Sequence, residues 1–584
     1  MSGYAAMNSA INGRVRSPTS GLCVSLWRIR RTPTPVATAR RRLPDAWTAG
    51  VLLIALAVAL PILTVAAFFF SPAGEVWEHL AATVLDDYVR NSLVLVLGVG
   101  VGTLLLGVST AWLTSMCTFP GRRLFSWALL LPLAMPAYII AYTYTGLLEV
   151  AGPVQATLRA AFAWEYGDYW FPEIRSLGGA ICMLSLVLYP YVYLLARAAF
   201  LEQSLCVLEV ARTLGCGPWR AFFTVAVPLA RPAIVAGLSL ALMETLADYG
   251  AVHYFGISTF TTGIFRTWFG LGDAAAAAQL AAVLLGFVFV LVALERGSRR
   301  RARYHHTTGR YQVLTPVRLR GWPAAGAVAA CLAPLLFGFA VPVAQLGIWA
   351  WQTAPKMVTP DFIALVANSF GLAATAAVLT VGVAAFLAYG QRLQPTLPVR
   401  LGVRVASMGY AIPGPVLAVG ILIPFGWLDN TIDAWMRASL GMSTGLLLSG
   451  TVFILLFAYA VRFMTAAVQT VEAGLGKVRP SMDEAARSFG YRGATVLARV
   501  HLPIMRGSLL TALLLVFVDV LKELPATLIM RPFDFNTLAV RAFELASDER
   551  LADSSTAALA IVLTGLLPVL LLSRSITRSR PGRS

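Results

Sequence analysis

Residues 482–503 read MDEAARSFGYRGATVLARVHLP, a polar segment with helical character that lies between two long apolar spans. Two alanines follow the acid Glu484, a glycine (Gly490) stands six residues after that acid, and the stretch ends in Leu-Pro. A segment this polar belongs outside the hydrocarbon of a membrane. A second copy of its pattern, described below, determines how we divide the chain.

The composition is that of a protein embedded in lipid. Of 584 residues, 58% are hydrophobic and only 13% are charged, which is typical of a polytopic membrane protein. The formal net charge of +18 comes from arginines in short segments between apolar spans, not from one basic face. We therefore expect a lipid bilayer as the surroundings and no nucleic acid as a partner.

Twelve apolar spans of about 20 residues are long enough to cross a bilayer as helices. The predicted spans of the first half are 47–70, 92–116, 125–148, 177–201, 233–255 and 275–295. Those of the second half are 323–350, 369–391, 401–426, 444–468, 508–530 and 555–573. The predicted fold class is an all-α polytopic membrane protein with twelve transmembrane helices in two homologous six-helix units.

Basic residues predict the orientation of the spans. Eight arginines lie between Arg14 and Arg42, and further arginines lie in the segment between the halves and in the C-terminal tail. Under the positive-inside rule, both termini and the middle segment are expected in the cytoplasm. The expected parts are a basic arm (1–46), a first unit (47–297), a basic linker (298–321), a second unit (322–573) and a basic tail (574–584).

The opening segment has a counterpart in the first half, EVARTLGCGPWRAFFTVAVPLARP (209–232). At a constant offset of 275, the matched positions are Glu209 with Glu484, Ala211 with Ala486, Gly215 with Gly490 and Pro228 with Pro503. Asn91-Ser92 matches Asn368-Ser369, and Ala134-Met-Pro136 matches Ala411-Ile-Pro413, both at an offset of 277. The repeats predict two related units in one polypeptide.

The segment itself predicts a short helix on the inner surface. Ser481 and Glu484 have the spacing of a capping box, so we expect the helix to start there. Gly490 is expected to end it, and Pro503 to mark where the next span begins.

The side chains of this helix suggest a docking surface. Ala485 and Ala486 would let another protein approach closely, Phe489 would be an apolar anchor, and Arg487 would offer a charge at the rim. The alternative is an ordinary amphipathic helix resting on lipid headgroups. Because the pattern recurs at equivalent places in both halves, we favour one partner surface that is used twice.

The pattern E-A-A-x-x-x-G with a downstream L-P resembles the coupling loop of binding-protein-dependent ABC importer permeases. The resemblance implies a bacterial inner membrane protein that works with two copies of a cytoplasmic ABC ATPase and a periplasmic substrate-binding protein. The first copy departs from the pattern at Val210 and Val227, and it has Cys206 in place of the capping serine.

The chain is not expected to hydrolyse ATP itself. A phosphate-binding loop needs a glycine-rich turn that ends in Gly-Lys-Ser/Thr, but Gly476-Lys477 is followed by Val478. We therefore predict a transport subunit that is not an enzyme and binds no cofactor, with ATP used by the partner.

Two acid pairs lie in the fifth predicted span of each half, Glu244 with Asp248 and Asp519 with Glu523. Their i, i+4 spacing predicts that each pair lies on one helical face, and Lys522 could neutralise one acid. A charge near mid-bilayer costs roughly 2.5 to 3.5 kcal/mol, so these acids should face a partner or a wet cavity. They indicate either a translocation pathway or gate, or a structural charge network that joins the units.

Carboxylates and phenolates, including Tyr249 and Tyr254, are hard oxygen ligands that suit ferric iron. The pattern does not identify metal ligands. Residues 244–269 and 521–547 resemble the corresponding segments of fused, twelve-span ferric-iron permeases, which implies iron import. Permeases for thiamine, phosphonate or polyamine share the coupling loop and remain alternatives.

A secondary transporter driven by an ion gradient is an alternative from a different class. Such a protein would also show two halves and a basic central linker. It would have no use for a duplicated coupling loop, however, and copurification of an ATPase subunit would separate the two classes.

The predicted topology can be tested with a reporter that is active only outside the cytoplasm. Fusions after residue 310 or 584 should be silent and a fusion near residue 165 should be active, because the loop around 165 carries acids and aromatics while its neighbours carry the arginines. The reverse pattern would overturn the orientation of every span.

Overall fold

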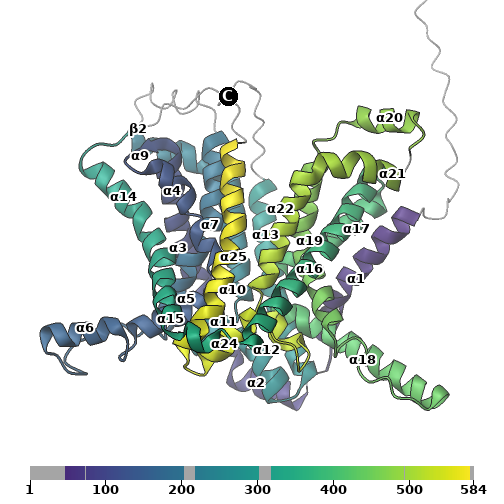
Figure 1. Cartoon of the computed structure of the whole chain (residues 1–584), viewed down its shortest axis with the longest axis horizontal. Coiled ribbons are helices and arrows are strands. Elements are labelled where there is room, and N and C mark those ends of the chain that lie inside the picture. Colours follow the sequence, from purple (N-terminus) through teal and green to yellow (C-terminus); the bar gives the residue numbers. More distant parts are fainter. Residues whose placement is uncertain (1–45, 73, 203–216, 301–316, 492, 579–584) are drawn as a thin grey trace, which may run out of the picture. The chain divides into compact units, whose positions relative to one another are not determined.

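Long apolar helices make up most of the structure, a computed structural model that describes residues 46–72, 74–202, 217–300, 317–491 and 493–578. Within these residues, eleven helices are long and apolar enough to cross a membrane. A bent pair, Arg122–Ala134 with Ala137–Phe162, supplies a twelfth crossing if it counts as one span. The prediction of an all-α polytopic protein is confirmed (Figure 1).

The first half contains, in chain order, α1 (Ala46–Phe68), α2 (Glu75–Thr83), α3 (Leu85–Met116), β1 (Cys117–Thr118), α4 (Arg122–Ala128), η1 (Leu131–Ala134), α5 (Ala137–Leu148), α6 (Pro153–Phe162), α7 (Leu177–Glu202), α9 (Pro218–Ala221), η2 (Phe222–Ala226), α10 (Val227–Ala247), α11 (Gly250–Tyr254), α12 (Phe260–Phe265), η3 (Arg266–Gly270) and α13 (Ala274–Arg300).

The second half contains β2 (Val317–Arg318), α14 (Trp322–Leu335), η4 (Leu336–Ala340), α15 (Val341–Met357), α16 (Pro360–Leu393), α17 (Leu397–Ala406), η5 (Gly409–Ala411), α18 (Gly414–Leu440), α19 (Val452–Leu475), α20 (Pro480–Ser488), α21 (Ala494–Val496), η6 (Leu497–His501), α22 (Leu502–Leu521), α23 (Pro525–Met530), α24 (Leu538–Ser547) and α25 (Leu551–Arg578).

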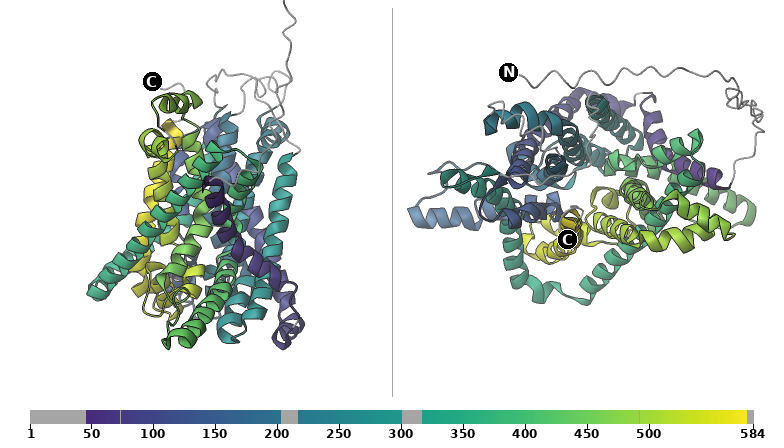
Figure 2. Two further views of the ribbon diagram at one scale, coloured as in Figure 1. Left: turned by 90° about the vertical axis from the view of Figure 1, so that its right-hand side faces the viewer. Right: turned by 90° about the horizontal axis from the view of Figure 1, so that it is seen from above.

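The same three-helix arrangement occurs in both halves. In the first half, α3, α7 and α10 pack against one another, and in the second half α16, α19 and α22 do the same. These helices are the second, fourth and fifth crossings of their halves. Figure 2 shows the long helices side by side in one bundle. The repeat seen in the sequence is therefore also a repeat of packing.

The two halves interlock through their first helices. One face of α1 is buried, with Val51, Ala55 and Val58 at helical spacing. This helix packs on the second half, where the Trp47 ring stacks on Phe386 with centroids 4.7 Å apart. In return, α14 packs on α3 and α4 of the first half. The parallel pairing of β1 with β2 joins the halves again.

Proline breaks the third crossing of each half. Pro136 and Pro413 precede α5 and α18, and the residues before them, Met135 and Ile412, are extended. A proline has no N–H and disfavours helical backbone in the residue before it. The predicted spans 125–148 and 401–426 therefore each contain a break, which the matching Ala-x-Pro motifs mark.

The fifth crossings are displaced from the predicted 233–255 and 508–530. Their helices end at Ala247 and Leu521, and the short helices α11 and α23 follow. They also start earlier, because a π-helical turn precedes both Pro228 and Pro503. A proline cannot make the regular i to i−4 bond, so one wider turn accommodates it. Pro503 thus lies inside the crossing and does not mark its start.

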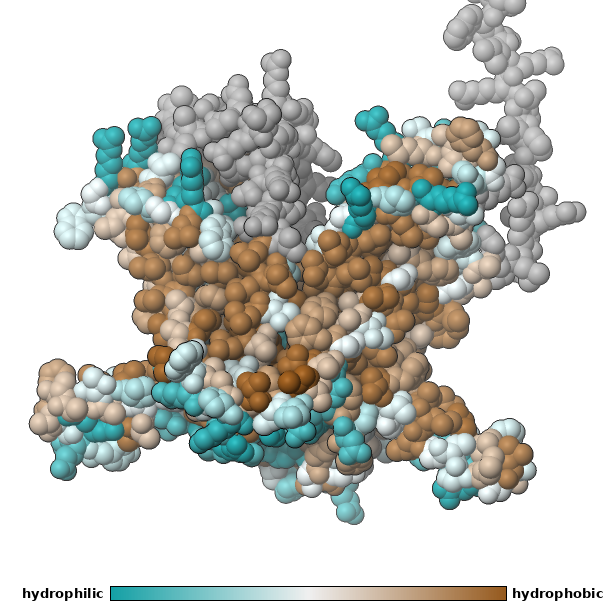
Figure 3. All heavy atoms as spheres, in the orientation of Figure 1, coloured by the Kyte–Doolittle hydropathy of each residue, from teal (hydrophilic) through white to brown (hydrophobic). Residues whose placement is uncertain are grey.

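A hydrophobic band crosses the middle of the face of the molecule that Figure 3 shows. In Figure 3 it separates hydrophilic surfaces at the two ends of the helices. Large apolar side chains face outward from the crossings, such as Leu53, Leu97 and Leu105. Such exposure is costly in water but favourable against lipid tails.

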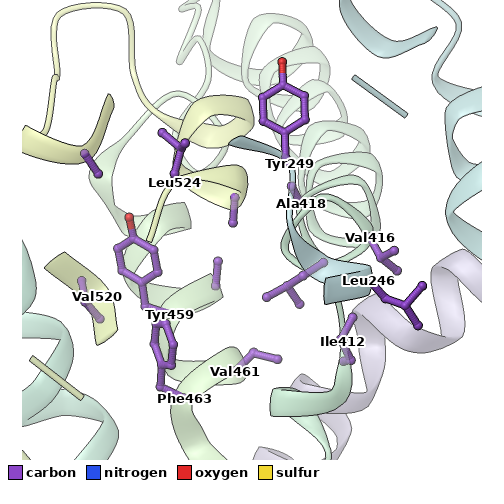
Figure 4. Packing of buried hydrophobic residues seen from close by; sticks show 14 of the residues in the cluster. Leu246, Tyr249, Ile412, Val416, Ala418, Tyr459, Val461, Phe463, Val520 and Leu524 are labelled. Atoms are coloured by element: carbon purple, nitrogen blue, oxygen red, sulfur yellow. The ribbon is translucent and has the colours of Figure 1, made fainter. Parts of the chain in front are cut away.

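The interior is a hydrophobic cluster to which both halves contribute. Figure 4 shows part of it, with Leu246 and Tyr249 from the first half among residues such as Val416, Tyr459 and Leu524 from the second. Burying side chains from both units in one cluster holds the units together and surrounds the polar site described below.

The interlock can be tested at Gly420 in α18, where an added Cβ would lie 2.5 Å from the backbone oxygen of Pro61 in α1. We expect Gly420→Ala to lower the free energy of unfolding by about 1–3 kcal/mol through overpacking. Gly426→Ala on the same helix is the matched control, because its Cβ would meet nothing within 4 Å. Equal melting temperatures in detergent for the two variants would contradict this packing of α1.

Candidate functional site

The four acids predicted from the fifth crossings line one cavity between the two halves. Its volume is about 120 Å³. Glu244 and Asp248 reach it from the end of α10, and Asp519 and Glu523 from the end of α22. Its other polar lining residues are Tyr138, Tyr191, Tyr410, Arg462 and Lys522.

The prediction that each acid pair lies on one helical face is wrong. Asp248 directly follows the last residue of α10 in extended conformation, and Glu523 lies beyond the end of α22. Each helix ends between the two members of its pair. The second acid therefore sits in a helix break and not one turn along the same face.

The second acid of each pair accepts hydrogen bonds from backbone N–H groups at the start of the short helix that follows the break. Asp248 Oδ1 accepts hydrogen bonds from the backbone N–H of Ala251 (3.0 Å) and Val252 (3.1 Å). Glu523 accepts from the N–H of Ala526 and Thr527, both at 3.1 Å. Free N–H groups at a helix start need partners, and a carboxylate supplies them. The same device thus recurs at matched positions of the two halves.

The charges of the cavity are not balanced. Lys522 Nζ lies 2.8 Å from Asp519 Oδ1, and Arg462 Nη1 lies 3.2 Å from Glu523 Oε1. Neither Glu244 nor Asp248 has an ion-pair partner in the described part of the chain. Four carboxylates therefore face two cations, and both unpaired acids belong to the first half.

The phenols of the cavity are not those that the sequence suggested. The Tyr249 ring stacks on Phe265 with centroids 3.7 Å apart, and Tyr254 lies under the Arg175 guanidinium. Neither residue lines the cavity. Instead Tyr191 and Tyr410, one from each half, lie there with their hydroxyl oxygens 3.5 Å apart.

Sequence reasoning missed Arg462, although a signal for it exists. It is the one charged residue in the apolar part of α19, and an ionisable residue inside a crossing indicates a functional or paired site. Tyr191 and Tyr410 had no comparable signal. Within the described ranges, no three His, Cys, Asp or Glu side chains are grouped so that they could hold a metal ion.

The second copy of the duplicated segment forms α20, which lies beyond the hydrophobic band at one end of the molecule (Figures 1 and 3). Glu484 and Ala485 are exposed, and Phe489 is 80% exposed. Ala486 is only 6% exposed, so it packs against other residues of this chain. The expectation that both alanines face a partner is wrong for Ala486, whereas Phe489 is free for contact.

The ends of α20 differ in how well they were predicted. Arg479 is the N-cap and Pro480 the first helical residue, so the expected capping box of Ser481 and Glu484 is not formed. A proline at the first position starts the helix instead. At the other end Gly490 adopts φ +84°, and the N–H of Tyr491 bonds to Ala486 O, so Gly490 ends the helix as expected.

Three of the four matched residues of the first copy lie outside the described residues. Glu209, Ala211 and Gly215 all fall within 203–216, which the structure does not describe. Pro228 is described and occupies the second position of α10. The docking role of the first copy therefore stays a prediction from the sequence.

The charge pairing can be tested at Glu523, which is 4% exposed. Arg462→Met leaves this carboxylate buried and unpaired, so we expect the free energy of unfolding to fall by about 3–5 kcal/mol. Adding Glu523→Gln should recover much of the loss. Thermal unfolding in detergent gives the comparison, with Glu244→Gln as the control that breaks no ion pair. Wild-type stability of Arg462→Met would contradict the pairing.

One family model and several known proteins match this chain. Residues 33–304 match the family described as binding-protein-dependent transport system inner membrane component. The chain is 26% identical over 547 residues to the Fe(3+)-transport system permease protein FbpB 2 of Haemophilus influenzae, an alignment that covers 91% of this chain and 99% of that protein.

Two further relatives carry other names. The molybdenum transport system permease protein ModB of Escherichia coli is 32% identical over 149 residues, which cover 26% of this chain and 62% of that protein. The putative 2-aminoethylphosphonate transport system permease protein PhnU of Salmonella choleraesuis is 29% identical over 214 residues, or 34% of this chain and 74% of that protein. Just under half of the chain therefore matches the family of binding-protein-dependent inner membrane transport components, and the relatives that align with this chain are named as permease proteins of transport systems.

Proposed function

We propose that this permease imports ferric iron, which a periplasmic binding protein delivers and a cytoplasmic ATPase drives across the membrane. The observation that carries the proposal is the acid-lined cavity between the halves, in which Glu244 and Asp248 have no cationic partner among the described residues. The cavity is the place where the substrate would pass from one half of the bilayer to the other.

The charge of the cavity favours a cation. With two of its four carboxylates unpaired, the lining has an excess of negative charge, which attracts Fe³⁺ and repels an oxyanion such as molybdate. Hard oxygen donors from carboxylates and phenols suit a ferric ion that passes through. The relative that aligns over nearly its whole length carries Fe(3+) transport in its name, which supports the same substrate.

The proposed partners and orientation rest on the two copies of the duplicated segment. We infer that α20 lies in the cytoplasm with both chain termini, because the basic segments of the sequence lie at the same side of the predicted topology. The exposed Phe489 on α20 would anchor one ATPase, and the segment that contains Glu209 and Gly215 would bind a second copy. The opposite end would receive the binding protein.

Uptake of radioactive ferric iron by a strain that lacks the gene tests the proposal. Wild-type protein should restore uptake, and Glu244→Gln with Asp248→Asn should lower it about tenfold, roughly 1.4 kcal/mol of lost attraction. The amide introduced at position 248 would still offer an oxygen to the N–H of Ala251, so the membrane protein level should not change. Glu75→Gln, an exposed acid on α2, is the control.

Competition identifies the substrate class. Excess molybdate or 2-aminoethylphosphonate should leave iron uptake unchanged. Restoration of molybdate or phosphonate uptake with no restoration of iron uptake would show that the iron assignment is wrong, while the importer assignment would stand.

A further inference from the structure

A cluster of charged and polar side chains fixes α20 to the transmembrane helices. Arg392 Nε, in the last turn of α16, donates to Asp483 Oδ2 of α20 at 2.9 Å. His501, at the start of α22, has its Nε2 2.5 Å from Asp483 Oδ1. One carboxylate on the short surface helix therefore bonds to both the second and the fifth crossing of the second half.

The cluster is sheltered and well connected. His501 is completely buried, and the ring of Tyr389 meets it edge to face with centroids 5.2 Å apart. Arg392 also donates to the carbonyl oxygens of Leu475 and Val478, both at 2.8 Å, which lie at and just after the end of α19. Cationic donors at the end of a helix satisfy its last carbonyls. The guanidinium thus connects α16, α19 and α20.

The Asp483 carboxyl carries the negative charge that strengthens its bonds to Arg392 and His501. Partial burial alone would raise the pKa of its carboxyl, but the hydrogen bonds from His501 and Arg392 outweigh burial and hold the pKa below its ordinary value. Hydrogen bonds to a charged group are stronger than those between neutral groups. The contact between α20 and α22 is therefore stiffer than an apolar contact between an exposed helix and a crossing.

The fifth crossing leads directly from this cluster to the cavity. Helix α22 begins next to His501 and runs without a break to Leu521, and it carries Asp519 at its far end. At 1.5 Å per residue, the distance along the helix from His501 to Asp519 is about 27 Å. A shift of α20 passed to His501 would move the acids of the cavity, because a helix transmits displacement along its axis.

The first half has different chemistry at the matched positions. At the offset of 275, Leu208 stands for Asp483 and Ala226 for His501. Leu208 lies outside the described residues, so only its identity is compared.

We propose that Arg392, Asp483 and His501 are positioning residues that transmit movement between the coupling helix α20 and the cavity through α22. The proposal rests on the proposed function, in which α20 docks on the ATPase. It adds the side chains through which that contact would act on the cavity.

The test uses the full complex of permease and ATPase in lipid nanodiscs, with binding protein loaded with ferric iron. In His501→Ala we expect the same amount of copurified ATPase and the same basal ATP hydrolysis as in the wild type. Hydrolysis stimulated by the binding protein should fall about tenfold, the equivalent of one lost charge-assisted hydrogen bond. Asp483→Asn should act in the same direction.

Two further variants separate transmission from simple support of the fold. His501→Gln keeps a side-chain N–H near the position of Nε2 and should restore most of the stimulation. Arg506→Ala, an exposed basic residue one turn along α22, is the matched control and should resemble the wild type. Normal stimulation in His501→Ala, lost ATPase binding in His501→Ala, or no rescue by His501→Gln would each overturn the proposal.

A failure of the proposed function gives a different result. Phe489→Asp places a charge on the exposed anchor of α20 and should abolish copurification of the ATPase. If that variant keeps its ATPase, α20 is not the docking helix. If the wild-type complex is not stimulated by the iron-loaded binding protein, the substrate assignment fails. Neither result depends on His501.

Discussion

A helix that breaks inside a membrane must find partners for its free backbone groups without water, and this constraint underlies the polar site. Asp248 and Glu523 meet it by accepting the N–H groups of the short helices after each break. The same two carboxylates line the cavity. The helix breaks and the polar cavity are therefore one feature, because the groups that satisfy the backbone are also the groups that a substrate would meet.

The cavity also depends on both halves being present. Its acids come from two crossings that lie in different halves of the sequence, and the proline breaks of the third crossings bring Met135 and Tyr410 to its wall. Helix α1 packs on the second half while α14 packs on the first. Separating the units would expose apolar surface in both of them, so the interlock keeps the site assembled.

The two halves share their arrangement of helices but differ in the charged residues at matched positions. Lys522 and Arg462, which pair with the acids of the second half, correspond to Ala247 and Val187 in the first. His501 likewise corresponds to Ala226. At the cavity, the ion pairs lie in the second half, whereas the acids that have no ion pair among the described residues belong to the first.

The sequence by itself determined the class of fold, the approximate number of crossings, the repeat and the acids that gather at the cavity. Apolar runs of the right length and a constant offset need no tertiary information. The tertiary structure decided where the fifth crossings end, because a carboxylate that satisfies the next helix permits a break that periodicity does not reveal. It also decided that Ala486 is buried, and that Tyr191 and Tyr410 reach the cavity while Tyr249 packs on Phe265. The neighbours of a crossing decide which of its faces meets protein, cavity or lipid. In a helix that is apolar all round, the sequence carries little information about those neighbours.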